Sequence, residues 1–300
     1  MGLRIVYMGT PEFAVEGLRA LVEAGKNVVA VVTGMDKPVG RGHQVQPTPV
    51  KEYAVAHGIP VLQPESLKDE GFIETLRQYD ADLQVVVAFR MLPEAVWAMP
   101  RLGTFNVHGS LLPQYRGAAP IQWAVMNGEK ETGLTTFLLD KTCDTGAIIE
   151  QVRTDIAPDE TVGNLYDRLM AMSGPMVLST LRRIEEADAE GRAVESHVQP
   201  VPEVLKPAPK IWRETMEIDW GKTVAEIHNH VRGLCPYPAA RTTIKLGEKE
   251  YEDVKVFRVQ AGKGLITRLA ADGEVSIEEL QLPGKKRMSA RDVMNGLRSC

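Results

Sequence analysis

The sequence has little cysteine and no long hydrophobic run. Its three cysteines, Cys143, Cys235 and Cys300, are far apart and form no C-x-x-C pair, which argues against a disulfide framework or a zinc site and for a reducing compartment. No apolar stretch approaches the roughly 18 residues that a membrane-spanning helix needs. The amino terminus lacks the features of a secretory signal in series. We therefore expect a cytoplasmic protein with no membrane partner.

Two short signatures are also incomplete. The glycines at positions 40 and 42 are not followed by a third, because position 45 is Val45, so a dinucleotide-binding fingerprint is excluded. Met1-Gly2 is not a convincing myristoylation site, because position 6 is Val6 rather than Ser or Thr. Internal repeats and low-complexity segments are absent from the sequence.

The 300 residues are too many for one ordinary core, so we expect two domains. Hydrophobic residues make up 44% and charged residues 25%, which is a globular composition. The net charge of −5 is uneven, since residues 207–300 hold 16 Lys and Arg against 13 Asp and Glu, and the remaining 206 residues hold 19 against 27. A basic carboxyl-terminal part suggests an anionic partner, but a fluctuation of surface charge explains the difference at least as well.

Apolar runs alternate with helical patterns through the first part of the chain. A helix is expected at residues 11–24 and a long one at 161–187, broken or kinked at Gly174-Pro175. Strands are expected at residues 3–8, 28–32, 82–88, 104–107, 134–139 and 147–152. This alternation predicts a Rossmann-like α/β domain with a mostly parallel sheet, in which ligands bind beyond the carboxyl ends of the strands.

The composition changes after the long helix. Residues 190–210 contain four prolines and no long apolar run, which indicates an extended linker. Short strands separated by turns follow at residues 240–246, 254–259, 264–269 and 274–280, and they predict a small OB-like β-barrel. We expect a catalytic domain at residues 1–189, a linker at 190–206 and a second domain at 207–300.

The densest cluster of chemically useful residues surrounds Asn106 and His108. Two residues apart in a strand, they point to the same face, where an amide and an imidazole can both hydrogen-bond a developing oxyanion. Asp144, in the turn between the two later strands, is the best candidate to orient the imidazole. On these residues alone, an ordinary strand-end histidine and a turn aspartate that caps its own backbone explain the pattern equally well.

The segment N-V-H-G-S-L-L-P-Q-Y-R-G-A-A-P-I-Q-W-A at residues 106–124, followed by D-T-G at 144–146, resembles the 10-formyltetrahydrofolate-dependent formyltransferases. The similarity extends to M-G-T-P-E-F-A at residues 8–14 and to G-K-K-R-M at 284–288, so it covers essentially the whole chain. It implies that Asn106, His108 and Asp144 form the catalytic set. It also makes residues 207–300 an OB-like tRNA-binding domain.

The resemblance implies transfer of formyl from 10-formyltetrahydrofolate to the methionine amine of initiator methionyl-tRNA, with tetrahydrofolate released. Asn106 and His108 would stabilise the oxyanion, and Asp144 would orient His108 and accept the amine proton, directly or through water. Neither a metal nor a covalent intermediate is required, and we expect a monomer. The folate-binding residues expected by resemblance are Phe89, Arg90, Met91, Leu92, Ser110, Leu111, Leu112 and Pro113.

The punctuated loop at residues 36–51 resembles the family's tRNA-contacting loop. Lys37, Arg41 and His43 are expected to contact tRNA there, and Lys206 and Lys210 at the start of the carboxyl-terminal part. His43 stands where relatives often have lysine, so this loop is less basic than many, and a flexible solvated loop is the alternative on the residues alone. The region 259–269 is shortened relative to longer family members.

Other functions remain open from the sequence. A glycinamide ribonucleotide formyltransferase would share the three catalytic residues, but Pro11 follows the first strand where a phosphate loop would need backbone donors. An amino-sugar formyltransferase would keep a similar carboxyl-terminal part but lack the loop at residues 36–51. A non-catalytic RNA-binding protein would not need Asn106, His108 and Asp144 together.

Overall fold

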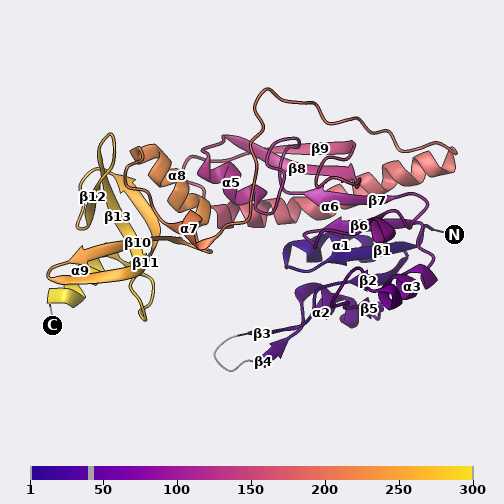
Figure 1. Ribbon diagram of the computed structural model, residues 1–300, viewed down its shortest axis with the longest axis horizontal. Helices are drawn as coiled ribbons and strands as arrows, with labels where there is room; N and C mark the ends of the chain where they lie inside the picture. Colours follow the sequence, from indigo (N-terminus) through magenta and orange to yellow (C-terminus); the bar gives the residue numbers. More distant parts are fainter. Residues whose placement is uncertain (1, 40–43, 299–300) are drawn as a thin grey trace. The chain divides into compact units, whose positions relative to one another are not determined.

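The computed structural model describes residues 2–39 and 44–298. The chain divides into two compact units (Figure 1). Unit 1 comprises Met1–Arg116, Gly133–Arg153 and Asp167–Pro207, and unit 2 comprises Gly117–Thr132, Thr154–Tyr166 and Ala208–Cys300. Each unit has a hydrophobic core of its own.

A seven-stranded sheet forms the centre of unit 1. The strands are β1 (Ile5–Gly9), β2 (Val28–Val32), β5 (Val61–Leu62), β6 (Leu83–Val87), β7 (Thr104–His108), β8 (Glu131–Leu138) and β9 (Ile148–Asp155). Their order is β5-β2-β1-β6-β7-β8-β9, with parallel pairing from β5 to β7 and antiparallel pairing between β7 and β8. The predicted mostly parallel sheet is therefore confirmed.

Helices cover both faces of this sheet. They are α1 (Phe13–Glu23), α2 (Pro49–Ala56), α3 (Glu70–Gln78), α4 (Glu94–Trp97) and α6 (Val162–Ala189). Val6 and Met8 of β1 pack in one cluster with buried residues of α3 and α4. Tyr7 points to the opposite face, as alternation in a strand requires, and its hydroxyl donates to the Ala14 carbonyl of α1 at 2.6 Å.

Helix α6 is continuous through Gly174 and Pro175, so a break there is wrong, while the alternative of a kink stays a prediction. Gly174 has a packing role instead, because a Cβ at this position would lie 3.0 Å from the Glu16 carbonyl of α1. The predicted apolar stripe is buried and offsets the hydrogen bond that Pro175 cannot donate. Its members are Leu165, Leu169, Val177, Leu181 and Ile184.

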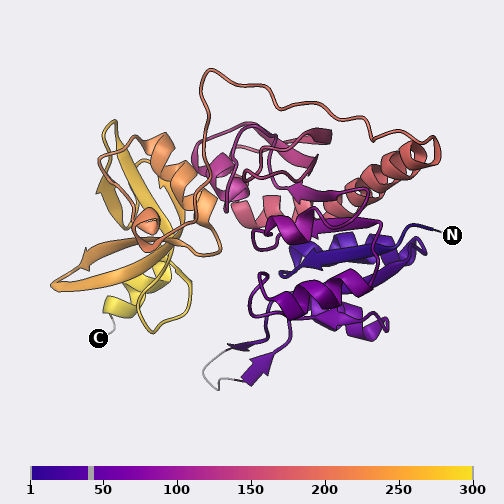
Figure 2. The same ribbon diagram turned by 45° about the vertical axis from the view of Figure 1, so that its right-hand side comes forward.

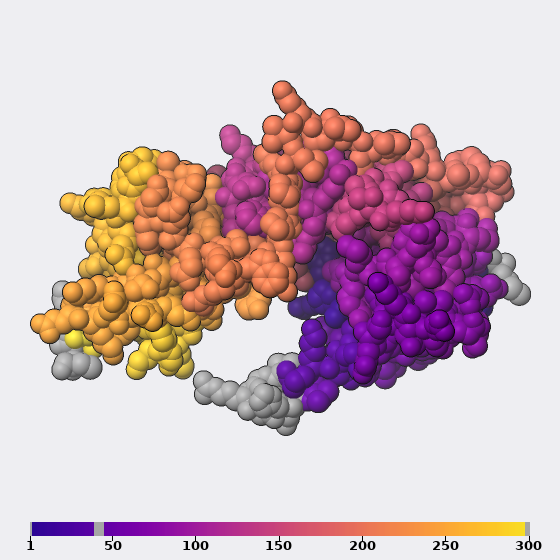
Figure 3. Space-filling view, in the orientation of Figure 1, coloured from indigo at the N-terminus to yellow at the C-terminus, as the bar shows by residue number. Residues whose placement is uncertain are grey.

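The segment at residues 36–51 was predicted to be a loop, and this prediction is wrong in part, because its described residues form two short strands and the start of a helix. β3 (Lys37–Val39) and β4 (Gln44–Gln46) pair antiparallel as a separate hairpin, which projects from the body of unit 1 in both ribbon views (Figures 1 and 2) and in the space-filling view (Figure 3). Helix α2 then begins at Pro49. Thr48 caps it by accepting the Lys51 amide at 3.1 Å, so Thr-Pro is a start signal in this segment.

Unit 2 contains a curled antiparallel sheet that forms a half-barrel. Its strands are β10 (Ala240–Leu246), β11 (Lys249–Ala261), β12 (Thr267–Leu269), β13 (Glu274–Gln281) and β14 (Met288–Ser289). The order is β10-β11-β13-β12, and β14 pairs with β13. The four predicted strands are present, and β11 extends beyond its predicted ends.

Helices pack against the core of this second sheet. Ile227 and Val231 of α8 share a buried cluster with Val254 and Val256 of β11 and Ile277 of β13. The helices of this unit are α5 (Pro120–Met126), α7 (Arg213–Met216), α8 (Val224–Leu234) and α9 (Ala290–Arg298). Thr223 and Glu226 form a capping box at the start of α8, which is the expected signature of a helix amino terminus.

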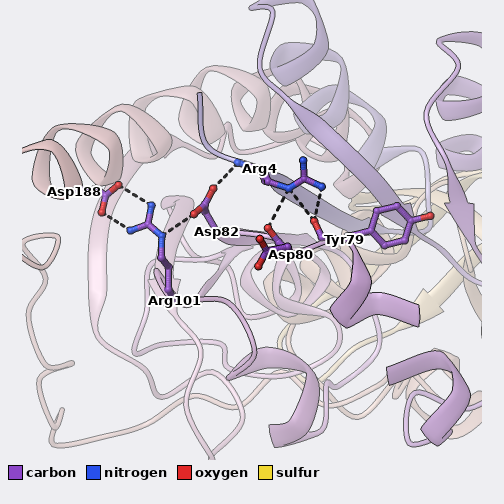
Figure 4. A network of polar contacts seen from close by, with 6 residues as sticks. All are labelled: Arg4, Tyr79, Asp80, Asp82, Arg101 and Asp188. Carbon is purple, nitrogen blue, oxygen red and sulfur yellow. Dashed lines mark hydrogen bonds and ion pairs between the residues drawn. The ribbon is translucent and has the colours of Figure 1, made fainter. Parts of the chain in front are cut away.

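A polar network that includes Arg101, on the chain before β7, joins three further segments of unit 1 (Figure 4). Arg101 donates to an Asp82 oxygen at 2.6 Å and forms a bidentate pair with Asp188 of α6 at 2.6 and 2.9 Å. Asp82 also accepts the Arg4 amide at 2.8 Å, and the Arg4 guanidinium donates to the Tyr79 carbonyl at 2.7 Å. The chain before β1, the chain before β6 and the end of α6 are thereby tied together.

Candidate active site

Strand β7 carries two of the three predicted catalytic residues. It lies between β6 and β8, where Asn106 pairs with Phe137 and His108 with Thr135. Both residues therefore occupy alternate positions of one strand and share a face, as predicted. β7 ends at His108, which places the imidazole at the carboxyl edge of the parallel strands, where ligands bind in such sheets.

The His108 side chain is oriented by a backbone carbonyl. The imidazole is 6% exposed, and its Nε2 lies 2.8 Å from the carbonyl oxygen of Tyr115. A carbonyl oxygen can only accept, so Nε2 carries the proton and Nδ1 is the acceptor of the neutral ring. Tyr115 could not be identified from the sequence, because its backbone carbonyl is the acceptor and any residue at that position would supply one.

The segment after β7 is held by internal hydrogen bonds. Ser110 donates its hydroxyl proton to the Gln114 carbonyl at 2.7 Å. Thr135 of β8 donates to the Ser110 carbonyl at 2.7 Å and accepts the Leu112 amide at 3.1 Å. Of the predicted folate-binding residues here, Ser110, Leu112 and Pro113 are buried and Leu111 is partly buried. The Ser110 hydroxyl is thus engaged in shaping the segment.

The turn that carries Asp144 has an internal frame. A carboxylate oxygen of Asp140 accepts the Thr142 amide at 2.9 Å and the Thr145 hydroxyl at 2.8 Å. Asp144 itself adopts a φ of 57°, in the left-handed region. Shielding of the neighbouring Cys143 thiol from water, with the charge of Asp144 and a hydrogen bond to it, raises the thiol pKa to about 11. The thiol is therefore neutral near pH 7.

Phe137 connects this turn with His108. Its ring lies edge-on to the imidazole, with ring centroids 6.5 Å apart and planes at 82°. A Cβ on Gly146 would lie 3.3 Å from the same ring and 1.6 Å from the Leu138 carbonyl, so only glycine allows the turn to fold this closely. The turn of Asp144 and the imidazole therefore border one ring. The role of Asp144 as the partner of His108 stays a prediction.

Strand β6 leads directly into the predicted folate-binding segment. Phe89 packs against the core cluster of β1 and β2, and Leu92 is 8% exposed, whereas Met91 is 77% exposed. An exposed methionine beside backbone amides at a strand end suits a flat, partly apolar ligand. These positions flank β7, because β6 and β7 are adjacent parallel strands.

Backbone acceptors outside the predicted folate-binding segment hold the side chain of Arg90. Its guanidinium donates to the carbonyls of Pro64 and Glu65 at 2.9 and 3.0 Å. The guanidinium carbon also lies 5.4 Å from the centroid of the Phe89 ring. These contacts give Arg90 a role in holding the wall of the segment.

The predicted tRNA-contacting residues fall in several places. Lys37 is exposed on β3, while Arg41 and His43 lie outside the described residues. Lys51 forms an ion pair with Asp36 at 2.6 Å. This hydrogen bond, followed by one from Gln63, lowers the pKa of the Asp36 carboxyl, so Lys51 anchors the base of the hairpin.

The two lysines near the linker differ in their surroundings. Lys206 is exposed in unit 1, and its amide donates to Gln114 Oε1 at 2.8 Å. Lys210 is exposed in unit 2, with its Nζ 4.4 Å from the centroid of the Trp212 ring. Trp212 is 58% exposed. A cation above an exposed aromatic ring is a combination that recurs in nucleic-acid contacts.

The described chain shows neither a metal-ion cluster nor a helix that could span a membrane. Within residues 2–39 and 44–298, no three His, Cys, Asp or Glu side chains are grouped to hold a metal ion. His228 lies in α8 with its Nε2 3.3 Å from Asp159, and His230 faces the Met216 carbonyl at 3.4 Å. Burial lowers the pKa of both imidazoles. Over the same residues, every helix is too short or too polar to span a bilayer.

Known proteins resemble the chain along nearly its full length. Residues 3–181 match the Formyl transferase family, and residues 210–298 match its C-terminal domain. The methionyl-tRNA formyltransferase of Bacteroides thetaiotaomicron is 51% identical, over 99% of this chain and 96% of that protein. The methionyl-tRNA formyltransferase of Phocaeicola vulgatus is 53% identical, also over 99% of this chain and 96% of that protein.

Solved structures share the fold at lower identity. The sugar 3N-formyl transferase WlaRD superposes with a TM-score of 0.66 at 17% identity, covering 95% of this chain and 100% of that one. HypX from Aquifex aeolicus, solved with tetrahydrofolic acid, gives a TM-score of 0.62 at 18% identity, over 98% of this chain and 47% of that one. With both parts of the chain matched in order and relatives about half identical, the chain belongs to the formyl transferase family.

Proposed function

We propose that this chain transfers the formyl group of 10-formyltetrahydrofolate to the methionine amine of initiator methionyl-tRNA, giving formylmethionyl-tRNA for translation initiation. The observation that carries the proposal is the similarity to methionyl-tRNA formyltransferases at 43–53% identity over 98–99% of this chain. The geometry of Asn106 and His108 on β7, with the turn of Asp144 nearby, supports it.

The proposed chemistry is an acyl transfer through a tetrahedral oxyanion. The neutral methionine amine attacks the formyl carbon, and the bond from that carbon to N10 of the folate then breaks. Asn106 donates to the oxyanion, and protonated His108 donates from Nδ1, since its Nε2 is held by the Tyr115 carbonyl. Asp144 accepts the amine proton, directly or through water, and protonated His108 helps to protonate the leaving N10 from its Nδ1, which gives tetrahydrofolate.

We assign the donor to the ends of β6 and β7, at Phe89, Arg90, Met91, Leu92 and residues 110–113. The acceptor would be bound by Lys37, Arg41 and His43 of the hairpin region and by Lys206 and Lys210. In this proposal residues 1–189 form the catalytic domain, 190–206 the linker and 207–300 the tRNA-binding domain, acting as a monomer in the cytoplasm. The net positive charge of residues 207–300 supports the placement of the tRNA.

A second candidate function is formyl transfer to an amino sugar. WlaRD covers 95% of this chain with the same fold, so the architecture alone accommodates either acceptor. Its 17% identity is far below that of the tRNA-directed relatives, and this difference favours the first proposal.

The test is transfer of labelled formyl from 10-formyltetrahydrofolate to initiator methionyl-tRNA, elongator methionyl-tRNA, glycinamide ribonucleotide and a nucleotide-linked amino sugar. We expect transfer to the initiator alone, reduced by about 10²–10⁴-fold in His108→Ala. His57→Ala is the matched control, because His57 also faces a backbone carbonyl at 2.8 Å but is exposed in another part of unit 1. Transfer to the ribonucleotide or the sugar, with none to the initiator, would refute the proposed acceptor.

A further inference from the structure

Gln199 is a buried side chain in the irregular segment after α6. It is 6% exposed, and its Nε2 donates to the carbonyls of Asp144 and Gly146, both at 2.9 Å. Its Oε1 accepts from Nη2 and Nε of Arg116 at 2.6 and 3.2 Å. A reversed amide would set its oxygen against two carbonyl oxygens and its NH₂ against a guanidinium. The hydrogen-bonding chemistry therefore fixes the orientation of the side chain.

The turn at residues 140–146 needs support on the side that Gln199 faces. Asp144 has a φ of 57°, a conformation that non-glycine residues rarely adopt and that persists when the surroundings determine it. Asp140 holds the turn from within through Thr142 and Thr145. Gln199 holds the carbonyls on either side of Thr145, so it restrains the backbone that directs the Asp144 carboxylate.

Backbone pairing sets the position of Gln199. Residues 197–206 (the strap) begin with a two-way hydrogen bond between His197 and Ile148 at 2.8 and 2.9 Å. The pairing is antiparallel, so the strap runs back along the chain that precedes β9 and brings Gln199 opposite Gly146. The position of Gln199 therefore follows from the register of the strap.

The far end of the strap is bonded to the segment that orients His108. The side chain of Gln114 donates from Nε2 to the Val204 carbonyl at 2.9 Å, and its Oε1 accepts the backbone N–H of Lys206 at 2.8 Å. The Tyr115 amide donates to the Lys206 carbonyl at 2.7 Å, and the Tyr115 carbonyl accepts from His108. Arg116, which holds Gln199, is the next residue. The hydrogen bonds of His108, Arg116 and Gln199, together with the peptide bond between Tyr115 and Arg116, therefore form one continuous path from His108 to the turn of Asp144.

We propose that Gln199 is a positioning residue for the reaction, which fixes the Asp144 turn relative to His108 through Arg116. This inference rests on the proposed function in assigning Asp144 a part in catalysis. Gln199 touches no reacting atom, so its loss should lower kcat and leave the KM for either substrate nearly unchanged. Loss of a merely structural residue would instead lower the thermal stability without a specific effect on kcat.

The decisive variant is Gln199→Glu, which keeps the size of the side chain and its pairing with Arg116. A carboxylate cannot donate, so one carboxylate oxygen would face the two carbonyl oxygens, and three oxygen atoms would meet where two hydrogen bonds existed. Gln281→Glu is the matched control, because Gln281 in unit 2 also donates to a backbone carbonyl, that of Lys285 at 2.7 Å. Gln199→Met, of similar length and uncharged, serves as a second variant should the first fold poorly.

Two measurements are made on the full chain: steady-state formyl transfer to initiator methionyl-tRNA and peptide-level hydrogen exchange. In Gln199→Glu and Gln199→Met we expect kcat to fall about 10–100-fold with each KM within about threefold. Exchange across residues 140–147 should become several-fold faster, with β1 and β6 unchanged. Gln281→Glu should match the wild type in both measurements.

Each outcome bears on the inference. A kcat within twofold of wild type, or unchanged exchange at residues 140–147, would overturn the positioning role. Faster exchange spread over the whole of unit 1 would also overturn it, because the residue would then be structural. If the wild type formylates no initiator tRNA while exchange at 140–147 rises in Gln199→Glu, the proposed function fails and the coupling of Gln199 to the turn stands.

Discussion

Two of the three predicted catalytic residues, His108 and Asp144, depend on their immediate neighbours. The Tyr115 carbonyl fixes the protonated nitrogen of His108, and the Asp140 frame shapes the turn of Asp144. Besides burial, the charge of the neighbouring Asp144 carboxylate and a hydrogen bond to it raise the pKa of the Cys143 thiol. The reactivity of the Cys143 thiol therefore depends on the negative charge of Asp144.

We predict that Cys143 reacts slowly with iodoacetamide at pH 8. Its pKa of about 11, against 9.0 for an ordinary thiol, lowers the thiolate fraction and hence the rate by about a hundredfold. Raising the pH should accelerate the reaction, which should reach half of its maximal rate near pH 11. Asp144→Asn should speed alkylation, because the negative charge and the acceptor of the thiol proton are removed.

The measurement is mass spectrometry of the peptide that contains Cys143, which separates it from the other cysteines. A free thiol such as glutathione, alkylated in the same solution, gives the reference rate. Alkylation at pH 8 as fast as the reference, or no effect of Asp144→Asn, would mean that the carboxylate does not act on this thiol.

At the scale of elements, sequence periodicity predicted the strands better than the connections. β1, β2 and β6 were evident because each is a short, mostly apolar run, and β7 was evident although polar residues alternate with Phe105 and Val107 in it. The hairpin of β3 and β4 was missed because three-residue strands outside the main sheet carry no period. The predicted break in α6 was wrong because Gly174 is needed for close packing against α1. Local helix signals contain no information on such tertiary packing.

Arg101 joins elements at the end of unit 1 opposite to the chemistry, and Arg101→Ala should lower the melting temperature modestly. The pairs are exposed, so we expect about 1–3 °C at pH 7. Arg77→Ala is the control, because Arg77 pairs only with Glu74 one turn away on α3 among the contacts seen in the described chain. It should have a smaller effect.

The difference between wild type and Arg101→Ala should depend on pH. The hydrogen bond from Arg101 lowers the pKa of Asp188, and bonds from Arg4 and Arg101 lower that of Asp82 although burial raises it. A lowered carboxyl pKa contributes stability that is present above the unfolded pKa of about 3.9 and is lost as pH falls through the folded value. Calorimetry should show the two melting temperatures converging below about pH 4. A constant difference from pH 7 to pH 3 would rule out this contribution.

At the scale of the whole molecule, the sequence motif identified the proposed catalytic residues but not the contacts that hold them. Asn106, His108 and Asp144 belong to recognisable segments, and strand alternation places the first two on one face. Gln199 lies in a segment with no period and no motif, so its contact with residues 144–146 becomes visible only in three dimensions. The charge asymmetry between the two parts of the chain suggested an anionic partner, but it did not indicate which lysines or arginines would bind that partner.

Lys210 is the cation of unit 2 for which the structure gives the clearest reason to expect tRNA contact, since it stands above the exposed ring of Trp212. We predict that Lys210→Ala raises the KM for initiator methionyl-tRNA about 3–10-fold and leaves kcat unchanged, because a phosphate contact contributes to binding alone. Loss of one such contact should reduce the slope of log(kcat/KM) against log salt by about one.

Lys68→Ala is the control for this effect, because Lys68 is an exposed lysine of unit 1 that no proposed contact includes. Measured between about 50 and 200 mM salt, it should reproduce the wild-type slope. If Lys210→Ala also keeps that slope and the wild-type KM, Lys210 is a solvated surface charge. The net positive charge of residues 207–300 would then have to act through other residues. A fall in kcat at unchanged KM would instead mean that Lys210 affects the chemical step rather than tRNA binding.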